Sequence, residues 1–306
     1  KVIAKFCNKK HLRFEVYEMA VISVCIPTYN RKKYLQQALQ SVFRQSFTDI
    51  EIVILDDGST DGTKEMVESL DQKVRYYRQP NKGEYRAVNE LIKLANCKYI
   101  CFLHSDDLLV EDAIERLYNS VKNEPEPVVA YGNYLRIDEN GDICGESKRK
   151  LYSGNITTQL FNDIIVHPVG SIFPRQVLLD AGGMDESLSF CADYKMELMI
   201  SLNYRFIALD KPTFMRRRHD NNTSQISFAN RLTEYNVLKD FYYNLGGKDI
   251  IPETVAGKRL AKEVYRAGKS AIAEGYREKG LSLLKESWQT CPTFKCLLHR
   301  IKAGVL

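Results

Sequence analysis

Two short apolar runs in this chain each lead into a pair of aspartates. The run Ile50–Leu55 precedes Asp56-Asp57, and the run Tyr99–Leu103 comes shortly before Asp106-Asp107. Such runs are typical of buried strands, and open α/β sheets bind ligands at the carboxyl ends of their strands. Adjacent carboxylates repel each other, so two such pairs predict cations or hydrogen-bond donors nearby. The pattern therefore indicates an enzyme site for a nucleotide, its pyrophosphate and a divalent metal.

From Val21 onward the chain alternates between strand-like and helix-like segments. Strands are predicted at Val21–Ile26, 50–55, Val74–Arg78 and Tyr99–Leu103, and helices at Tyr34–Phe43, Met66–Leu70, 84–95 and 111–122. Short connections between alternating strands and helices predict a mostly parallel sheet with helices on both faces. The expected fold class is therefore α/β.

After Pro125 the pattern changes. Asp138–Gly141, with Asn-Gly in the turn, separates Val128–Ile137 from Ile143 and predicts a β-hairpin. Beyond it we expect a mobile surface loop at Gly145–Asn155, a strand at Ser171–Arg175, a helix at Tyr194–Leu202 and only helices from Gln225 onward.

The expected domains are an extension of uncertain structure over residues 1–19, a catalytic domain over 20–225 and a helical region over 226–306. We expect the catalytic domain to divide into a nucleotide-binding half, 20–110, and an acceptor half, 111–225.

The composition, 44% hydrophobic and 27% charged, is that of an ordinary globular protein. No apolar run approaches the roughly 18 residues that a membrane span needs, and Lys1–Ala20 does not resemble a secretory signal. The eight cysteines include no Cys-x-x-Cys spacing, so we interpret them as reduced thiols. These features predict a cytoplasmic protein.

The charge is unevenly distributed. From Lys258 to the end, eleven Lys and Arg face four acidic residues, a net +7, so the remainder of this +5 chain carries −2. A basic tail suggests an anionic neighbour, either the lipid headgroups at the inner face of a membrane or a polyanionic substrate. Solvated faces of amphipathic helices are an equally good interpretation. We expect no nucleic-acid partner.

Two common nucleotide-binding motifs are absent. The turn after the first strand, Pro27–Arg31, contains no glycine, so a Gly-x-Gly-x-x-Gly dinucleotide site is excluded. The chain also has no Gly-x-x-x-x-Gly-Lys-Ser/Thr phosphate loop. The nucleotide must therefore be held by carboxylates and a metal.

A series of motifs resembles the family 2 glycosyltransferases, which are inverting enzymes of the GT-A fold. The matching segments are Ile26–Arg31, Leu55–Thr63, Asn81–Gly83 with Ala87 and Asn89, Ser105–Asp107, Gly182–Ser187, Asp193-Tyr194 and Arg218–Ser224. They span roughly residues 20–225 in the expected order.

The resemblance implies roles on the donor side. Asp57 would accept a hydrogen bond from N3–H of a uracil-type base, because a carboxylate has only acceptors. Pro27, Thr28 and Tyr29 would line the base and ribose, and Asp106 would meet the ribose. For Asp56 a turn-capping role is the better interpretation.

By the same resemblance, Asp107 binds Mg²⁺ or Mn²⁺ bridging the two phosphates, and His219 is an added metal or phosphate ligand. One departure is that His104 stands where many relatives have an aspartate. Arg86 either approaches the diphosphate or is an exposed helix cation. Arg216–Arg218 alternate on a predicted strand, so not all three can face the phosphates.

On the acceptor side the resemblance makes Asp193 the general base that deprotonates the attacking hydroxyl. The alternative is a helix-capping aspartate. For Asp185 local hydrogen bonding is the better interpretation.

These implications predict a metal-dependent inverting glycosyltransferase. It would move a sugar from a UDP- or dTDP-sugar to a hydroxyl of a glycan or lipid-linked glycan, in building a bacterial surface polysaccharide. The alternatives are a nucleotidyltransferase, which normally has a glycine-rich loop after its first strand, and a non-catalytic nucleotide- or glycan-binding module.

Overall fold

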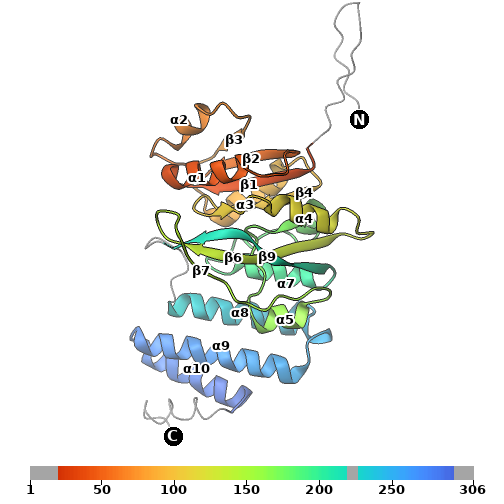
Figure 1. The fold of residues 1–306 in the computed structure, drawn as a ribbon. Coiled ribbons are helices and arrows are strands. Elements are labelled where there is room, and N and C mark those ends of the chain that lie inside the picture. Colours follow the sequence, from red (N-terminus) through yellow and green to blue (C-terminus); the bar gives the residue numbers. More distant parts are fainter. Residues whose placement is uncertain (1–19, 219–226, 293–306) are drawn as a thin grey trace, which may run out of the picture.

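The computed structural model describes residues 20–218 and 227–292. These residues form a nine-stranded sheet with the order β3-β2-β1-β4-β8-β6-β9-β5, and β7 pairs with β6 (Figure 1). The first four strands are parallel: β1 (Ile22–Thr28), β2 (Ile50–Asp56), β3 (Arg75–Arg78) and β4 (Tyr99–Phe102). The predicted strand runs are therefore confirmed, and both acidic pairs follow strands that flank β1.

The second half of the sheet is mixed. Strand β6 (Val128–Ile137) pairs in parallel with β9 (Arg205–Arg217) and antiparallel with β8 (Ile172–Pro174) and β7 (Ile143–Glu146). The short strand β5 (Leu108–Leu109) pairs antiparallel with β9. The predicted hairpin at Asp138–Gly141 is confirmed as the β6–β7 connection.

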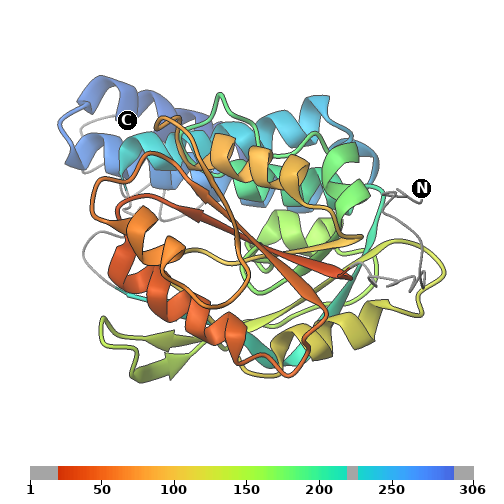
Figure 2. The ribbon, with the colours of Figure 1, turned by 90° about the horizontal axis from the view of Figure 1, so that it is seen from above.

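Helices cover both faces of the sheet. On one face β1 and β2 side chains pack with α1 (Lys32–Phe43), α2 (Thr63–Glu68) and α4 (Ala113–Val121). On the other face they pack with α3 (Glu84–Leu94), while α5 (Thr157–Asn162), α6 (Arg175–Asp180) and α7 (Ala192–Ser201) extend the same core. Seen from above, α1 and α4 lie on one side of the strands and α3 on the other (Figure 2). Because side chains alternate along each strand, residues of the same strand contribute to the hydrophobic cores on both faces of the sheet.

Three long helices complete the described chain. They are α8 (Phe228–Asn244), α9 (Glu253–Ala273) and α10 (Arg277–Thr290), with a 3₁₀ turn, η1 (Gly247–Asp249), between the first two. They form the lower layers in Figure 1, and the buried core continues into them from the sheet. The predicted helical C-terminal region is confirmed over this range. Among the described helices, none has the length and apolarity required to cross a bilayer.

Some elements differ from the sequence expectation. Helices α5 and α6 were not predicted, because six residues are too few to show a helical period. Strand β9 begins at Arg205, although only Phe214–His219 was predicted as a strand. Pro212 and its polar neighbours interrupt the apolar pattern that is typical of a strand. The pairing of β9 with β6 shifts its register between Gly132 and Tyr134, which leaves these residues outside the regular pairing. A side chain at position 132 would meet Thr213 Cγ2 at 2.7 Å, so glycine is required there.

The segment expected as a loop, Gly145–Asn155, is partly ordered by pairing. Gly145 and Glu146 belong to β7, and Gly154 forms a bridge with Phe206 of β9.

Candidate active site

The two aspartates after β2 have different surroundings. Asp56 is fully buried, and its Oδ1 accepts a hydrogen bond from Ser59 N over 2.7 Å. Its Oδ2 accepts another from the Tyr76 hydroxyl over 2.5 Å. Asp56 therefore stabilises the turn, as the sequence predicted.

Asp57 is held by the loop that precedes α3. Its Oδ1 accepts hydrogen bonds from Gln79 Nε2 (2.8 Å) and Lys82 N (2.9 Å), and its Oδ2 accepts one from Gly83 N (2.8 Å). Gly83 has φ = 93°, which glycine adopts without steric strain. A carboxylate offers about four lone-pair positions, so three donors leave one position for a ligand N–H. This geometry is compatible with the predicted contact to a base.

The turn after β1 contains the other residues predicted to line the nucleotide. Pro27 lies in β1, and Thr28 at its end is buried with no hydrogen-bond partner for Oγ1 in the described chain. Tyr29 follows and is 47% exposed. Asn30 donates its backbone N–H to Ser59 Oγ over 2.8 Å, which ties this turn to the one containing Asp57. An exposed aromatic ring thus stands beside the Asp57 loop.

The second acidic pair forms a cluster with His104. Ligand atoms of His104, Asp106 and Asp107 lie within 4.8 Å of one another. Burial, and then the charge of Asp106, raise the pKa of Asp107 to about 6. An imidazole nitrogen with carboxylate oxygens suits Mn²⁺, and the carboxylates also suit Mg²⁺. The residues present therefore fit a divalent cation, with His104 in place of the usual aspartate.

Two arginines fix this cluster. Arg31 Nη1 lies 2.8 Å from Asp106 Oδ2. The buried Arg217 donates its backbone N–H to Asp107 Oδ1 over 2.9 Å and its Nε–H to the Asp106 carbonyl over 2.8 Å. Its guanidinium also lies over the Tyr34 ring. Arg217 therefore faces the protein interior.

Glu84, the first residue of α3, connects the Asp57 loop to the His104–Asp106–Asp107 cluster. Gly83 contacts Asp57, and the next side chain, Glu84, lies with Oε1 3.3 Å from His104 Nε2. Burial alone would lower the pKa of His104, but Glu84, followed by Asp107, Asp106 and Asp193, raises it. The charge of Asp193 therefore acts on the same histidine.

Asp193 lies in the first turn of α7, half-buried beside this cluster. Burial, and then Glu84, raise the pKa of Asp193 above its usual value. Cys191, the residue before α7, makes no side-chain capping hydrogen bond. Asp57 is thus connected to Asp107 and Asp193 through Gly83, Glu84 and His104.

Arg86 and Asp185 have protein partners. Arg86 Nε lies 3.0 Å from Glu186 Oε2, and its side chain is half-exposed. Asp185 accepts hydrogen bonds from Ser187 N and Oγ and lies 2.8 Å from Lys195 Nζ. These bonds agree with the local role expected for Asp185. The proposed contact of Arg86 with a diphosphate stays a prediction.

His219, predicted as a metal or phosphate ligand, lies outside the described residues. Several other polar groups near the site were not predicted from the sequence. Arg149 Nη1 lies 3.1 Å from His167 Nε2, and Glu197 is buried one turn after Asp193 on α7. Only contacts between distant segments reveal this group, so no local sequence signal could have found it.

An α/β sheet with helices on both faces and an acidic turn after each of the strands β2 and β4 is typical of the GT-A class of glycosyltransferases. The chain belongs to family 2 of these enzymes, because the profile of "Glycosyl transferase family 2" matches residues 23–181, slightly more than half of its length. The predicted family and fold class are confirmed.

Individual known proteins are similar over longer or shorter stretches. Chondroitin synthase of Escherichia coli is 32% identical over 208 residues, which are 67% of this chain but only 30% of that protein. Staphylococcus aureus TarS 1–349 in complex with UDP-GlcNAc superposes with a TM-score of 0.64 at 20% identity, covering 89% of this chain and 82% of TarS. Mannosyltransferase PcManGT of Pyrobaculum calidifontis, in complex with GDP-Man and Mn²⁺, has a TM-score of 0.58 at 15% identity, covering 92% and 79%.

Proposed function

We propose that this chain is a metal-dependent, inverting glycosyltransferase that moves a sugar from a UDP-sugar to a hydroxyl of a glycan acceptor. The observation that carries the proposal is the convergence of Asp57, the His104–Asp106–Asp107 cluster and Asp193, connected by Gly83 and Glu84. A donor-binding carboxylate, a cation site and a base are what a single displacement requires.

On the donor side, Asp57 has one acceptor position left after its three hydrogen bonds, and uracil offers N3–H to it. Tyr29 lies beside it as a surface for the base or ribose. Cytosine has no N3–H, so the carboxylate favours UDP over CDP. The complex of TarS with UDP-GlcNAc supports a UDP-sugar as the donor. The complex of PcManGT with GDP-Man makes a GDP-sugar the competing candidate.

Asp107, with Asp106 and His104, would hold Mg²⁺ or Mn²⁺ next to the diphosphate. A divalent cation there supplies positive charge for the leaving nucleoside diphosphate. Arg217 keeps both aspartates oriented toward that position through its bonds to Asp107 Oδ1 and the Asp106 carbonyl.

Asp193 would accept the proton of the acceptor hydroxyl as that oxygen attacks the anomeric carbon. Burial raises its pKa, and a more basic carboxylate is a better proton acceptor near neutral pH. Because the acceptor displaces the diphosphate directly, the configuration inverts and no covalent enzyme intermediate forms. The relation to a chondroitin synthase supports a bacterial polysaccharide as the product.

Release of nucleoside diphosphate from UDP-, dTDP- and GDP-sugars, with and without Mn²⁺, tests the proposal. Asp193→Asn should keep its UDP affinity while turnover falls by about 10²–10⁴-fold. Asp210→Asn, an exposed carboxylate on β9, is the matched control. Turnover of Asp193→Asn close to that of the control would refute the assigned base, and a product of retained configuration would refute inversion.

A further inference from the structure

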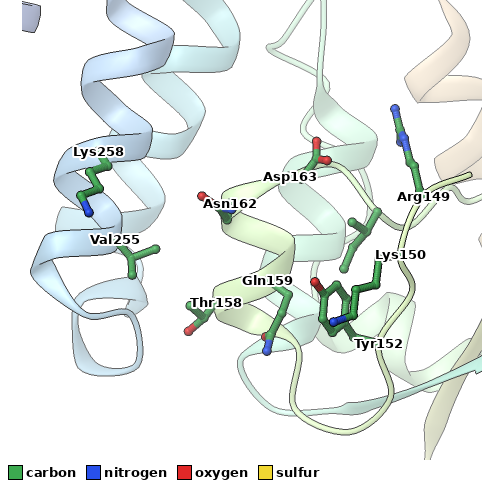
Figure 3. Close-up of a pocket in the computed structure, with 10 residues that line it drawn as sticks. Arg149, Lys150, Tyr152, Thr158, Gln159, Asn162, Asp163, Val255 and Lys258 are labelled. Carbon is green, nitrogen blue, oxygen red and sulfur yellow. The ribbon is translucent and has the colours of Figure 1, made fainter. Parts of the chain in front are cut away.

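A cavity of about 440 Å³ lies apart from the nucleotide site, and we call it the basic pocket. Its walls come from the segment 149–152, from α5 and from the start of α9, with α5 between the other two (Figure 3). Catalytic domain and C-terminal helices therefore both contribute to it. A volume of this size is within the range of pockets that bind small molecules.

The charge of the basic pocket is positive. Arg149, Lys150 and Lys258 line it, against a single carboxylate, Asp163. Over residues 20–218 and 227–292, no carboxylate lies within ion-pair distance of these three cations. Lys150 and Lys258 stand on opposite sides of α5 (Figure 3). Cations that line one pocket without a carboxylate partner favour an anionic occupant, and arginine pairs well with carboxylate or phosphate.

The remaining lining groups suit a saccharide. Tyr152 offers an aromatic ring, with Lys150 Nζ 5.1 Å from its centroid. Thr158 and Asn162 add a hydroxyl and an amide. Gln159 also lines the pocket, and its Oε1 is a buried acceptor without a partner in the described chain. Such an acceptor is destabilising unless a donor, such as a bound hydroxyl or water, satisfies it.

The basic pocket is connected to the proposed catalytic base. Arg149 lines the pocket, donates to the Ile164 carbonyl and lies 3.1 Å from His167 Nε2. Glu197 is buried near Arg149, and it follows Asp193 by one turn of α7. Arg149 and Asp193 therefore both lie close enough to Glu197 for their charges to act on it.

We propose that the basic pocket binds an anionic glycan acceptor, an oligosaccharide that carries carboxylate or phosphate groups, and holds it while its end reaches Asp193. This inference rests on the proposed glycosyltransferase function and specifies its acceptor. Lys150 and Lys258 contact the anionic groups, and Tyr152 and the side chains of α5 contact the sugar rings.

Binding without any donor tests the site independently of turnover. The probes are a uronate-bearing hexasaccharide, a phosphate-bearing hexasaccharide and the neutral N-acetylchitohexaose, titrated calorimetrically into the full chain at low and high salt. We expect one of the two anionic probes to bind, more weakly in high salt because exposed charges are screened. Which of them binds identifies carboxylate or phosphate.

The variants are Lys150→Ala and Lys258→Ala. The matched controls are Lys148→Ala, in the same segment, and Lys269→Ala, on the same helix, because neither residue lines the pocket. Each pocket variant should weaken binding of the anionic probe by roughly three- to tenfold, as expected for loss of one charge-assisted hydrogen bond. The controls should bind like the wild type.

Equal binding of the neutral probe, no binding of either anionic probe at millimolar concentration, or equal losses in pocket and control variants would overturn the inference. In the transferase reaction, the pocket variants should raise the acceptor KM by the same factor and leave donor hydrolysis unchanged. If no sugar nucleotide turns over, the proposed function fails, whereas the binding results still decide the glycan site.

Discussion

The backbone N–H of Arg217 donates a hydrogen bond to Asp107 Oδ1 over 2.9 Å. The side chain of the same arginine reaches the carbonyls of Asp106, Asp138 and Glu139 at 2.8–3.0 Å. One buried residue at the end of β9 therefore joins the turn containing Asp106 and Asp107 to the β6–β7 turn. The orientation of the predicted metal ligands depends on a residue 110 positions further along the chain.

Arg217→Lys should weaken both the fold and the metal site. An ammonium cannot reproduce the fork of donors that reaches several carbonyls, so buried acceptors lose their partners. We expect a loss of about 2–4 kcal/mol in the free energy of unfolding and at least about tenfold weaker Mn²⁺ binding. Urea denaturation and Mn²⁺ titration measure the two effects. Arg218→Lys, the exposed neighbour, should behave like the wild type, and unchanged Mn²⁺ affinity in Arg217→Lys would contradict the role given to Arg217.

Asp57→Asn should reduce base selectivity. The amide keeps one acceptor oxygen, and its NH₂ group would face donors that now point at the carboxylate. We expect UDP to bind about 10- to 100-fold more weakly, with a smaller preference for UDP over CDP. Competition binding with the two nucleotides measures this, and Asp71→Asn, in an exposed loop, is the control. If the ratio of the UDP and CDP affinities did not change, Asp57 would not be the residue that distinguishes the bases.

Sequence patterns predicted those parts of the site that short segments determine. Strands β1, β2 and β4 are mostly apolar runs, and Asp56 stands where β2 ends, so its turn-capping role could be predicted. The parallel order of these strands follows from their alternation with helices.

The rest depends on contacts between distant residues. Glu84 meets His104, and Arg149 meets His167, only because the sheet places separate loops together. Burial of a polar side chain also cannot be predicted from the neighbouring sequence. A glutamate in a helix, such as Glu197, is expected on the exposed face, yet Glu197 is only 1% exposed. His219 was predicted from its motif alone and lies outside the described residues.

His167 predicts a pH dependence of stability. Burial, and then Arg149 and Arg216, lower the pKa of His167 to about 3. An unfolded chain takes up this proton near pH 6.5, so the wild type loses up to about 1.4 kcal/mol of stability per pH unit as the pH falls below that value. His167→Gln keeps an acceptor for Arg149 without titrating, and its stability should fall less between pH 6.5 and 4.5. Urea denaturation across this range measures the difference, and an NMR titration that places the His167 pKa near 6.5 would contradict it.

The most strongly buried ion pairs of the described chain predict how α8 and α9 hold together. Arg259 is 3% exposed, and its guanidinium lies 2.5 Å from Glu263 Oε1 and 3.1 Å from Glu234 Oε1. Arg259→Ala would leave two buried carboxylates without their main cation, so we expect a loss of about 3–5 kcal/mol in the free energy of unfolding. Arg266→Ala removes a half-exposed partner of the same Glu263 and should cost less than about 1 kcal/mol. Urea denaturation of both variants decides the matter, because equal losses would mean that burial adds nothing to the Arg259 pairs. Both arginines were counted in the +7 of the C-terminal region, so part of that charge is neutralised within the fold and is not available to an anionic surface.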